Sequence, residues 1–163
     1  GRITLGANSG LERMYTVVIT AAKPDIIQNK LVSNLQVASG KPYKVVDNLS
    51  ERSLASIDRP YVLKDIPEML LGQTYIKTAT EDWRNSSNPF LSFDVNQPVT
   101  VYMAIYGSPL SWMSGFEDTG ETLIHSARNV TMKIFSKTFQ AGRITLGANS
   151  GLERMYTVVV SAI

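Results

Sequence analysis

The segment Gly1–Val18 recurs unchanged at Gly142–Val159, so the chain carries the same sequence near both ends. The two copies start 141 residues apart and differ only beyond Val18, where Ile19 corresponds to Val160 and Thr20 to Ser161. Such drift is typical of natural repeat units. Two identical segments cannot both occupy one position in a sheet, and an unpaired strand is costly. The duplication therefore predicts that one copy pairs outside its own folding unit.

Alternation of apolar and polar residues predicts strands along most of the chain. In Val99–Tyr106 the apolar side chains of Val99, Val101, Met103 and Ile105 alternate with Thr100, Tyr102, Ala104 and Tyr106. This period of two is typical of a strand. Similar runs are 91–95, 130–134, 143–146 and 155–160, with weaker candidates at 43–46, 61–64 and 74–78.

Frequent prolines and turn residues argue against long helices. Only Lys64–Leu71 and Ile26–Val37 have a pattern that could hold a short helix. About eight short strands with frequent turns favour an all-β fold, an antiparallel two-sheet β-sandwich that is jelly-roll-like.

The same patterns divide the chain into three parts. Residues 1–20 form a tail strand pair equivalent to 142–161, and residues 21–29, which include Lys23-Pro24-Asp25, form a linker. Residues 30–163 then make one complete sandwich unit. The carboxyl-terminal copy is expected to complete this unit, because a short path joins it to its own domain.

Three interpretations of the leading copy stay open. It belongs to the preceding unit of a tandem array, or it is donated to a neighbouring subunit, which would make a head-to-tail fibre. The third is that the duplication was introduced artificially. In the first two, strand pairing would rest on Ile3, Leu5, Tyr15, Val17, Ile19, Tyr156, Val158 and Val160.

Composition excludes several classes of function. The formal net charge is only +2, and the basic residues are scattered, so a nucleic-acid partner is not expected. No apolar run approaches the length of a membrane span. The absence of cysteine excludes thiolate metal sites and cysteine nucleophiles. The chain begins with Gly and has no signal-peptide pattern, which suggests a piece of a longer protein or a processed form.

Catalytic signatures are weak, and we expect no enzyme activity. His125 is the only histidine, and a lone histidine is more often structural. Glu117, Asp118 and Glu121 could supply a carboxylate pair for glycoside hydrolysis, but their clustering favours a solvated loop. The same loop could hold a structural calcium ion through Asp118, Thr119 and Glu121, because calcium prefers several oxygen ligands.

Aromatic side chains and sequons give two further candidate sites. Trp83, Tyr106, Trp112 and Phe116 could stack on sugar rings, although such residues often pack the core. Three N-glycosylation sequons begin at Asn48, Asn85 and Asn129, and Asn129 falls on the outward set of its expected strand.

Several segments together resemble a known type of domain. They are Tyr61–Ala79, Val99–Tyr106, Trp112–Glu121, Phe139–Asn149 and Met155–Val159. In this order they resemble a carbohydrate-binding-module-like β-sandwich of large bacterial secreted and surface proteins, including polysaccharide-degrading enzymes. The resemblance covers roughly residues 55–160 and implies loop-forming roles for Trp112, Asp118 and Gly120.

One departure from that pattern affects the expected function. The family usually follows Val-Tyr-Met-Ala with Tyr-Asp and an arginine, whereas this chain has Ile105-Tyr106-Gly107-Ser108. The departure favours a structural repeat over sugar capture. The sequence therefore predicts a non-enzymatic, extracellular or cell-surface structural or adhesive module that assembles head to tail with copies of itself. The alternative is a carbohydrate-binding module that targets a secreted enzyme to polysaccharide.

Overall fold

The computed structural model describes residues 30–151 and 153–163 of the chain. The predicted tail strand pair at 1–20 and the linker at 21–29 lie outside the described residues. The helix expected at Ile26–Val37 lies partly inside them. Over that part the prediction is wrong, because Val32–Val37 forms a strand.

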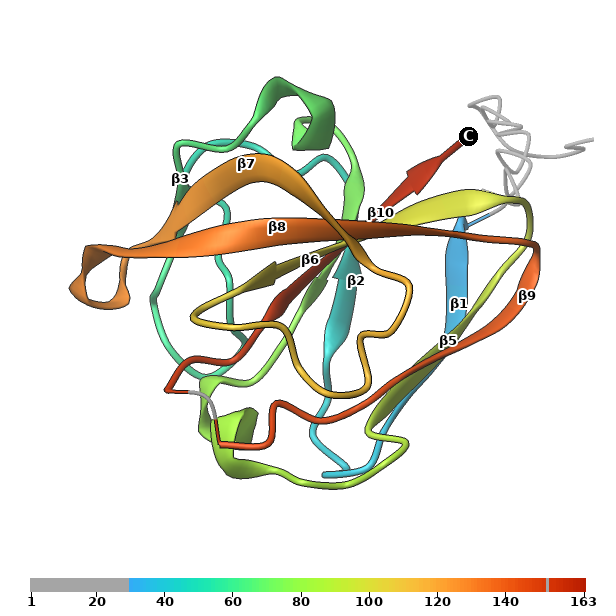
Figure 1. Ribbon diagram of the computed structural model, residues 1–163, viewed down its shortest axis with the longest axis horizontal. Helices are drawn as coiled ribbons and strands as arrows, with labels where there is room; N and C mark the ends of the chain where they lie inside the picture. The colour runs from blue at the N-terminus through green and yellow to red at the C-terminus, as the bar shows by residue number, and fades with distance from the viewer. Residues whose placement is uncertain (1–29, 152) are drawn as a thin grey trace, which may run out of the picture.

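The described residues form two antiparallel sheets, which confirms the predicted all-β sandwich (Figure 1). The smaller sheet has the order β1 (Val32–Val37), β5 (Leu91–Val95) and β9 (Gly142–Leu146). The larger has seven strands in the order β2 (Lys44–Val46), β4 (Thr74–Lys77), β10 (Thr157–Ala162), β6 (Val99–Ile105), β8 (Val130–Phe139), β7 (Glu117–His125) and β3 (Leu63–Lys64).

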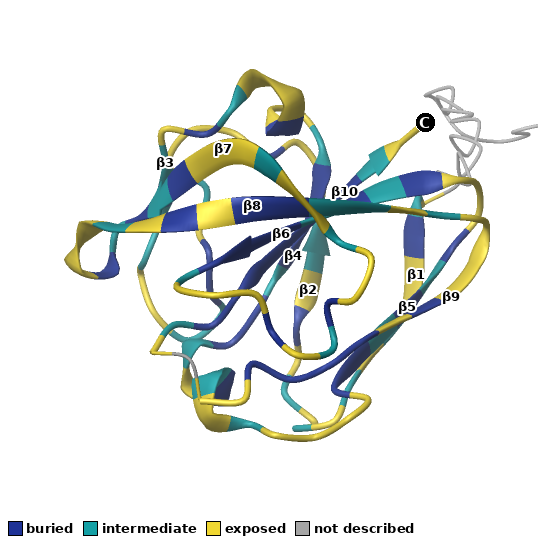
Figure 2. Cartoon of the chain, viewed as in Figure 1, coloured by how far each residue is buried: buried dark blue, intermediate teal, exposed yellow. Residues whose placement is uncertain are grey.

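Strand β10 of the larger sheet is covered on both faces, and this explains why its sequence is apolar at successive positions. Val158 and Val160 of β10 enter the core between the two sheets, and Val159 enters a second cluster on the opposite face. That second cluster is closed by Leu49, Leu63 and Leu70, which lie on the segment before β4. A strand that is buried on both faces has a continuous apolar run in its sequence. Figure 2 shows β10 and β6 largely in dark blue, the colour of buried residues.

The alternation predicted for Val99–Tyr106 is confirmed. Val99, Val101, Met103 and Ile105 of β6 lie in the core between the sheets, while Ala104 lies in the second cluster with Tyr102 and Tyr106 packed against it.

The second copy of the duplicated segment is divided between the sheets. Its first strand, β9, lies at an edge of the smaller sheet and pairs with β5. Its second strand, β10, lies inside the larger sheet between β4 and β6. The residues from Gly147 onward therefore connect two sheets and do not close a hairpin.

Short 3-10 turns supply the remaining regular structure. They are η1 (Glu68–Leu70), η2 (Thr80–Arg84) and η3 (Ala127–Asn129). The helix expected at Lys64–Leu71 is thus reduced to the single turn η1. Within residues 30–151 and 153–163 there is no helix of the length and apolarity needed to cross a membrane.

Candidate functional site

The solvent-facing side of the smaller sheet carries a network of polar side chains centred on Arg143. From β9, its Nη1 donates to the backbone oxygen of Asn34 and to Oδ1 of Asp94, both at 3.1 Å. Its Nη2 donates to Oε1 of Gln36 at 2.6 Å and to Oγ of Ser92 at 2.7 Å. One guanidinium from β9 thus contacts both other strands, β1 and β5, and fixes the orientation of an amide, a carboxylate and a hydroxyl.

Asp94 of β5 is ionised and held in place within this network. The Asn34 side-chain amide donates to its Oδ2 at 2.6 Å, and Arg143 contacts its other oxygen. These two interactions, with the Asn34 hydrogen bond the larger, lower the pKa of the Asp94 carboxyl. The carboxylate is therefore a permanent acceptor at neutral pH.

A shallow hollow of about 240 Å³ adjoins this network. It is lined by Gln36, Val37, Ala38, Pro89, Phe90 and Ser92. Gln36 and Ser92 belong to both features, so the polar strip and the partly apolar hollow form one continuous surface. We call this surface, made of the Arg143 network and the adjoining hollow, the β1–β5–β9 face.

Sequence analysis did not identify the β1–β5–β9 face. The partners of Arg143 lie between 49 and 109 residues away in sequence, so no local motif joins them. One local signal could have indicated a polar surface here. Polar residues alternate with core residues on two strands, Ser92 and Asp94 on β5 and Arg143 and Thr145 on β9.

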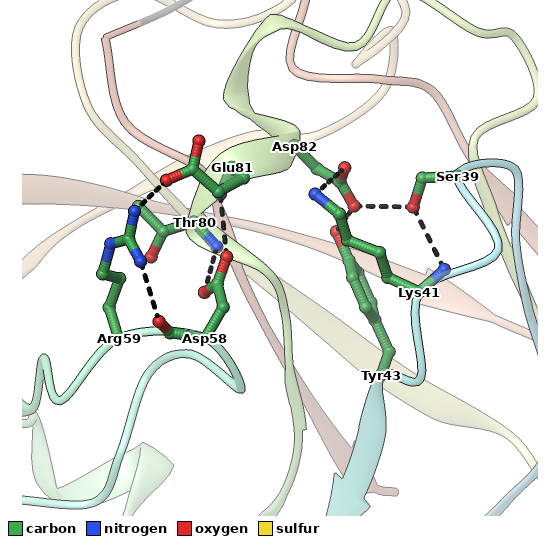
Figure 3. A network of polar contacts seen from close by, with 8 residues as sticks. All are labelled: Ser39, Lys41, Tyr43, Asp58, Arg59, Thr80, Glu81 and Asp82. Carbon is green, nitrogen blue, oxygen red and sulfur yellow. Dashed lines mark hydrogen bonds and ion pairs between the residues drawn. The ribbon is translucent and has the colours of Figure 1, made fainter.

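A second polar cluster surrounds the buried carboxylate of Asp82 in η2 (Figure 3). Ser39 and Tyr43 donate hydroxyl hydrogen bonds to its Oδ2 at 2.7 and 2.8 Å, and Lys41 contacts Oδ1 at 2.8 Å. Burial and the Asp82 hydrogen bond raise the pKa of the Tyr43 phenol. With both oxygens satisfied, Asp82 joins η2 to the β1–β2 loop and has no free position for a substrate.

Asp58 caps the start of η2 beside this cluster (Figure 3). Its two oxygens accept from the backbone nitrogens of Thr80 at 2.8 Å and Glu81 at 3.1 Å. The Glu81 side chain in turn forms an ion pair with Arg59. Both carboxylates are therefore occupied by contacts within the protein.

The structure brings two of the four predicted sugar-binding aromatics together. Trp112 and Phe116 meet edge to face with ring centroids 6.2 Å apart, and Trp112 also meets Tyr156 at 6.1 Å. The indole nitrogen of Trp112 donates to the Ala148 backbone oxygen at 2.8 Å. Trp112 thus fastens the β6–β7 loop to the connection between β9 and β10.

The other two aromatics have different surroundings. Trp83 is half-buried in η2 and packs against the main core, with the Arg84 guanidinium 4.3 Å from its ring centre. Tyr106 packs against the second cluster on the opposite side of the larger sheet. Tyr106 therefore lies on the other side of the larger sheet from Trp83, Trp112 and Phe116, and sugar binding by these rings stays a prediction.

The residues proposed for calcium lie at the start of β7, so the loop expected there is a strand. Asp118 Oδ1 accepts from the Gly120 nitrogen at 2.9 Å, and the Thr119 hydroxyl donates to the Ile134 oxygen at 2.8 Å. Within the part of the chain that the structure describes, no three Asp, Glu or His side chains converge as a metal-binding group. The calcium site stays a prediction.

The three sequon asparagines lie in loops and turns. Asn48 and Asn129 are exposed, and Asn85 is half-buried. Asn129 ends the η3 turn and precedes β8, so it lies outside the strand that sequence analysis assigned to it. Glycosylation at these positions also stays a prediction.

The predicted strand-pairing residues of the second copy are core residues of this sandwich. Tyr156, Val158 and Val160 are fully buried. Their counterparts in the first copy, Ile3, Leu5, Tyr15, Val17 and Ile19, lie outside the described residues.

Comparisons with known proteins show that the fold of this chain resembles regions of two solved structures. The chain is similar to a β-glucuronidase from glycoside hydrolase family 2, with 22% identity and a TM-score of 0.74 over 94% of this chain. It is also similar to an enzyme of glycoside hydrolase family 138 that targets the pectin rhamnogalacturonan II, with 14% identity and a TM-score of 0.50 over 77% of this chain. No protein-family model and no curated protein sequence matches it.

The chain spans a small part of these structures, 17% of the β-glucuronidase and 16% of the pectin enzyme. The similarity is therefore to one domain-sized β-sandwich region within much longer chains.

Proposed function

We propose that this chain is a non-catalytic carbohydrate-binding domain of a larger secreted protein, and that it binds polysaccharide through the β1–β5–β9 face. The observation that carries the proposal is the Arg143 network, which holds donors and acceptors from three strands in fixed positions at the surface.

The chemistry of this face suits a sugar chain. Each sugar hydroxyl is both a donor and an acceptor, so it needs ordered partners of both kinds. The four terminal N–H groups of Arg143 are used within the network, so Arg143 positions the other groups. The Gln36 amide nitrogen and the Ser92 O–H then offer donors, while Asp94 and Ser92 offer acceptors. The hollow beside them adds Pro89 and Val37, whose apolar surface suits the C–H face of a sugar ring. An open strip across three strands also suits a polymer better than a small free ligand.

The neighbouring structures support the same function. Both contain a similar β-sandwich within a glycan-degrading enzyme, and in both that region is a small fraction of the chain. An accessory domain that holds an enzyme near its polysaccharide fits this arrangement. It is the alternative that sequence analysis left open, and the comparisons favour it over fibre assembly.

Affinity electrophoresis through gels containing neutral or acidic polysaccharides tests the proposal. We expect the protein to be retarded by at least one polymer, and Arg143→Gln or Gln36→Ala to reduce the affinity about tenfold, which corresponds to one charge-assisted hydrogen bond. Arg52→Gln, which removes an exposed arginine outside the β1–β5–β9 face, is the matched control. Unretarded wild-type protein in every gel, or an unchanged Arg143→Gln variant, would contradict the proposal.

Head-to-tail assembly is the second candidate function, favoured by the duplicated segment. The first strand of the second copy, β9, is an edge strand of the smaller sheet. Its outer side pairs with no other strand of the described residues. A matching strand from a second molecule could add there through backbone hydrogen bonds. The comparisons add nothing to this candidate. Deletion of residues 1–20, described in the Discussion, tests it.

A further inference from the structure

A second hollow lies near the turn between β7 and β8, away from the Arg143 network. Its volume is about 250 Å³, and it is lined by Tyr61, Thr80, Ser126, Ala127, Arg128 and Arg154. It combines two guanidinium groups with three hydroxyl side chains. We call this hollow the two-arginine pocket.

Arg154, which lines the two-arginine pocket, has one donor that no described residue engages. Its Nη1 donates to the Glu153 backbone oxygen at 2.7 Å, but its Nε is buried and has no hydrogen-bond partner. Buried donors are nearly always satisfied by protein, water or ligand. Because Nε is buried, a ligand in the hollow would have to approach the terminal nitrogens of Arg154 instead.

Arg128 occupies a backbone position that does not suit arginine. It lies in η3 with φ of +60°, the left-handed region that residues with a side chain rarely adopt. The turn is held by the Ala127 nitrogen donating to Nδ1 of His125 at 3.2 Å and by the Asn129 nitrogen donating to the Ser126 oxygen. The same conformation occurs at Arg52, so it identifies no site by itself; its role here is to fix the backbone from which Arg128 lines the pocket.

The positive charge of the pocket is not neutralised by neighbouring acids. None of the ion pairs among the described residues involves Arg128 or Arg154. Two carboxylates that lie beside Thr80 are already engaged, Asp58 by the backbone nitrogens of Thr80 and Glu81, and Glu81 by Arg59. His125, buried beside the pocket, is neutral because burial and the Arg154 charge lower its pKa.

We propose that the two-arginine pocket binds the carboxylate or sulfate group of an acidic sugar. Guanidinium groups recognise such planar or multi-oxygen anions through paired hydrogen bonds. Thr80 Oγ1 is hydrogen-bonded to Ser56 Oγ at 2.7 Å, and Ser126 Oγ accepts from the Val62 nitrogen at 2.9 Å. The Tyr61 hydroxyl and the remaining O–H of Ser126 are therefore the groups that would meet the hydroxyls of the same sugar. The volume is below the 300–1,000 Å³ or so of drug-sized sites, which suits a single sugar residue.

This inference rests on the proposed carbohydrate-binding function for its ligand class, but its residues are separate from those of the β1–β5–β9 face. Isothermal titration with galacturonate, glucose 6-sulfate and neutral galactose tests it directly. We expect binding of at least one of the two charged sugars and not of galactose, and the preferred charged sugar distinguishes carboxylate from sulfate recognition.

Variants assign the binding to the pocket. We expect Arg154→Gln and Arg128→Asn each to weaken binding of the charged sugar about tenfold or more, since each removes charge-assisted hydrogen bonds. Asparagine tolerates the left-handed conformation, so Arg128→Asn keeps the turn even if Arg154→Gln unfolds the protein. Lys133→Gln, which removes an exposed charge on β8, is the control and should bind as wild type does.

Two results would overturn the inference. One is equal binding of galactose and the charged sugars, and the other is unchanged affinity in Arg128→Asn. Both differ from failure of the proposed function, which would appear as loss of retardation in every polysaccharide gel. Retardation that depends on Arg143 alone would keep the carbohydrate-binding function and reject this pocket.

Discussion

At the scale of single residues, His125 shows how burial sets a charge state. Its side chain is 5% exposed, and Nδ1 accepts from the Ala127 nitrogen, so the ring has no route to solvation as a cation. Burial is the larger cause and the Arg154 charge the smaller one, and together they lower the pKa of His125 to about 4. A histidine that sequence analysis considered for catalysis is thus a neutral acceptor that shapes the turn before β8.

The pKa of His125 predicts acid sensitivity. In the unfolded chain its pKa is near 6.5, so between about pH 6.5 and pH 4 the unfolded state binds more protons than the folded state. Stability is therefore present in full above pH 6.5 and declines as the pH falls toward 4. We expect this residue to account for a loss of at most about 3 kcal/mol over that window.

Urea unfolding at a series of pH values measures this effect. His125→Asn, whose Oδ1 can replace Nδ1 as the acceptor, should show a shallower decline between pH 6.5 and 4. A variant that declines as steeply as wild type would mean that other groups cause the acid sensitivity.

At the scale of elements, the contact between Trp112 and Gly147 holds the β6–β7 loop against the second copy. A β-carbon added at Gly147 would lie 2.3 Å from Cδ1 of Trp112, too close for any real contact. Glycine is therefore required here by the indole ring, which is itself anchored through its nitrogen to Ala148. The aromatic residue acts as a structural wedge in this arrangement.

This contact predicts that the effects of substitutions at Gly147 and Trp112 on the free energy of unfolding depend strongly on each other. Gly147→Ala should destabilise the protein by about 2 kcal/mol, because the overpacked ring must move. In a Trp112→Leu background the same change should cost much less, since the smaller side chain leaves room, giving a coupling energy of about 1 kcal/mol or more.

A double-mutant cycle measured by thermal or urea unfolding gives that coupling energy. Gly115→Ala serves as a comparison for backbone strain alone, because Gly115 has φ of +78° and its added carbon would meet only the flexible Lys137 side chain. If the effects of Gly147→Ala and Trp112→Leu on the free energy of unfolding are additive, the Trp112 ring is not the reason that glycine is required at position 147.

At the scale of the whole molecule, the second copy of the duplicated segment is integral to the sandwich. β10 pairs with β4 and β6 through the middle of the larger sheet, and Tyr156, Val158 and Val160 are buried in the core. A matching segment cannot take that position without displacing β10. Self-assembly through the first copy would therefore need strand exchange, or addition at an edge strand of the described sheets such as β9.

Deletion of residues 1–20 separates the two candidate functions. If the first copy mediates assembly, the full chain should form concentration-dependent polymers in sedimentation velocity runs, and the shortened chain should sediment as a monomer. Polysaccharide binding through the β1–β5–β9 face should be unchanged by the deletion. Identical monomeric behaviour of both chains would remove fibre assembly as a candidate.

The strands that sequence analysis missed show where local patterns fail. Before and within β1, Leu31 and Leu35 are four residues apart, a spacing that also fits a helix, and a register shift between Ser33 and Gln36 interrupts the pairing of the strand. β7 begins with exposed residues and has a similar irregularity between Asp118 and Thr122, so its first half reads as a loop. Both irregularities depend on the partner strand, which the local sequence does not reveal.

The sequence by itself determined the all-β class, the alternation of β5 and β6 and the duplication, because each is written in neighbouring residues or in direct identity. Only the tertiary structure decided that β9 and β10 belong to different sheets, that Arg143 gathers side chains from β1 and β5, and that Arg128 and Arg154 meet in one pocket. These features join residues far apart in the chain, and their energies come from packing and hydrogen bonds that exist only once the two sheets have assembled.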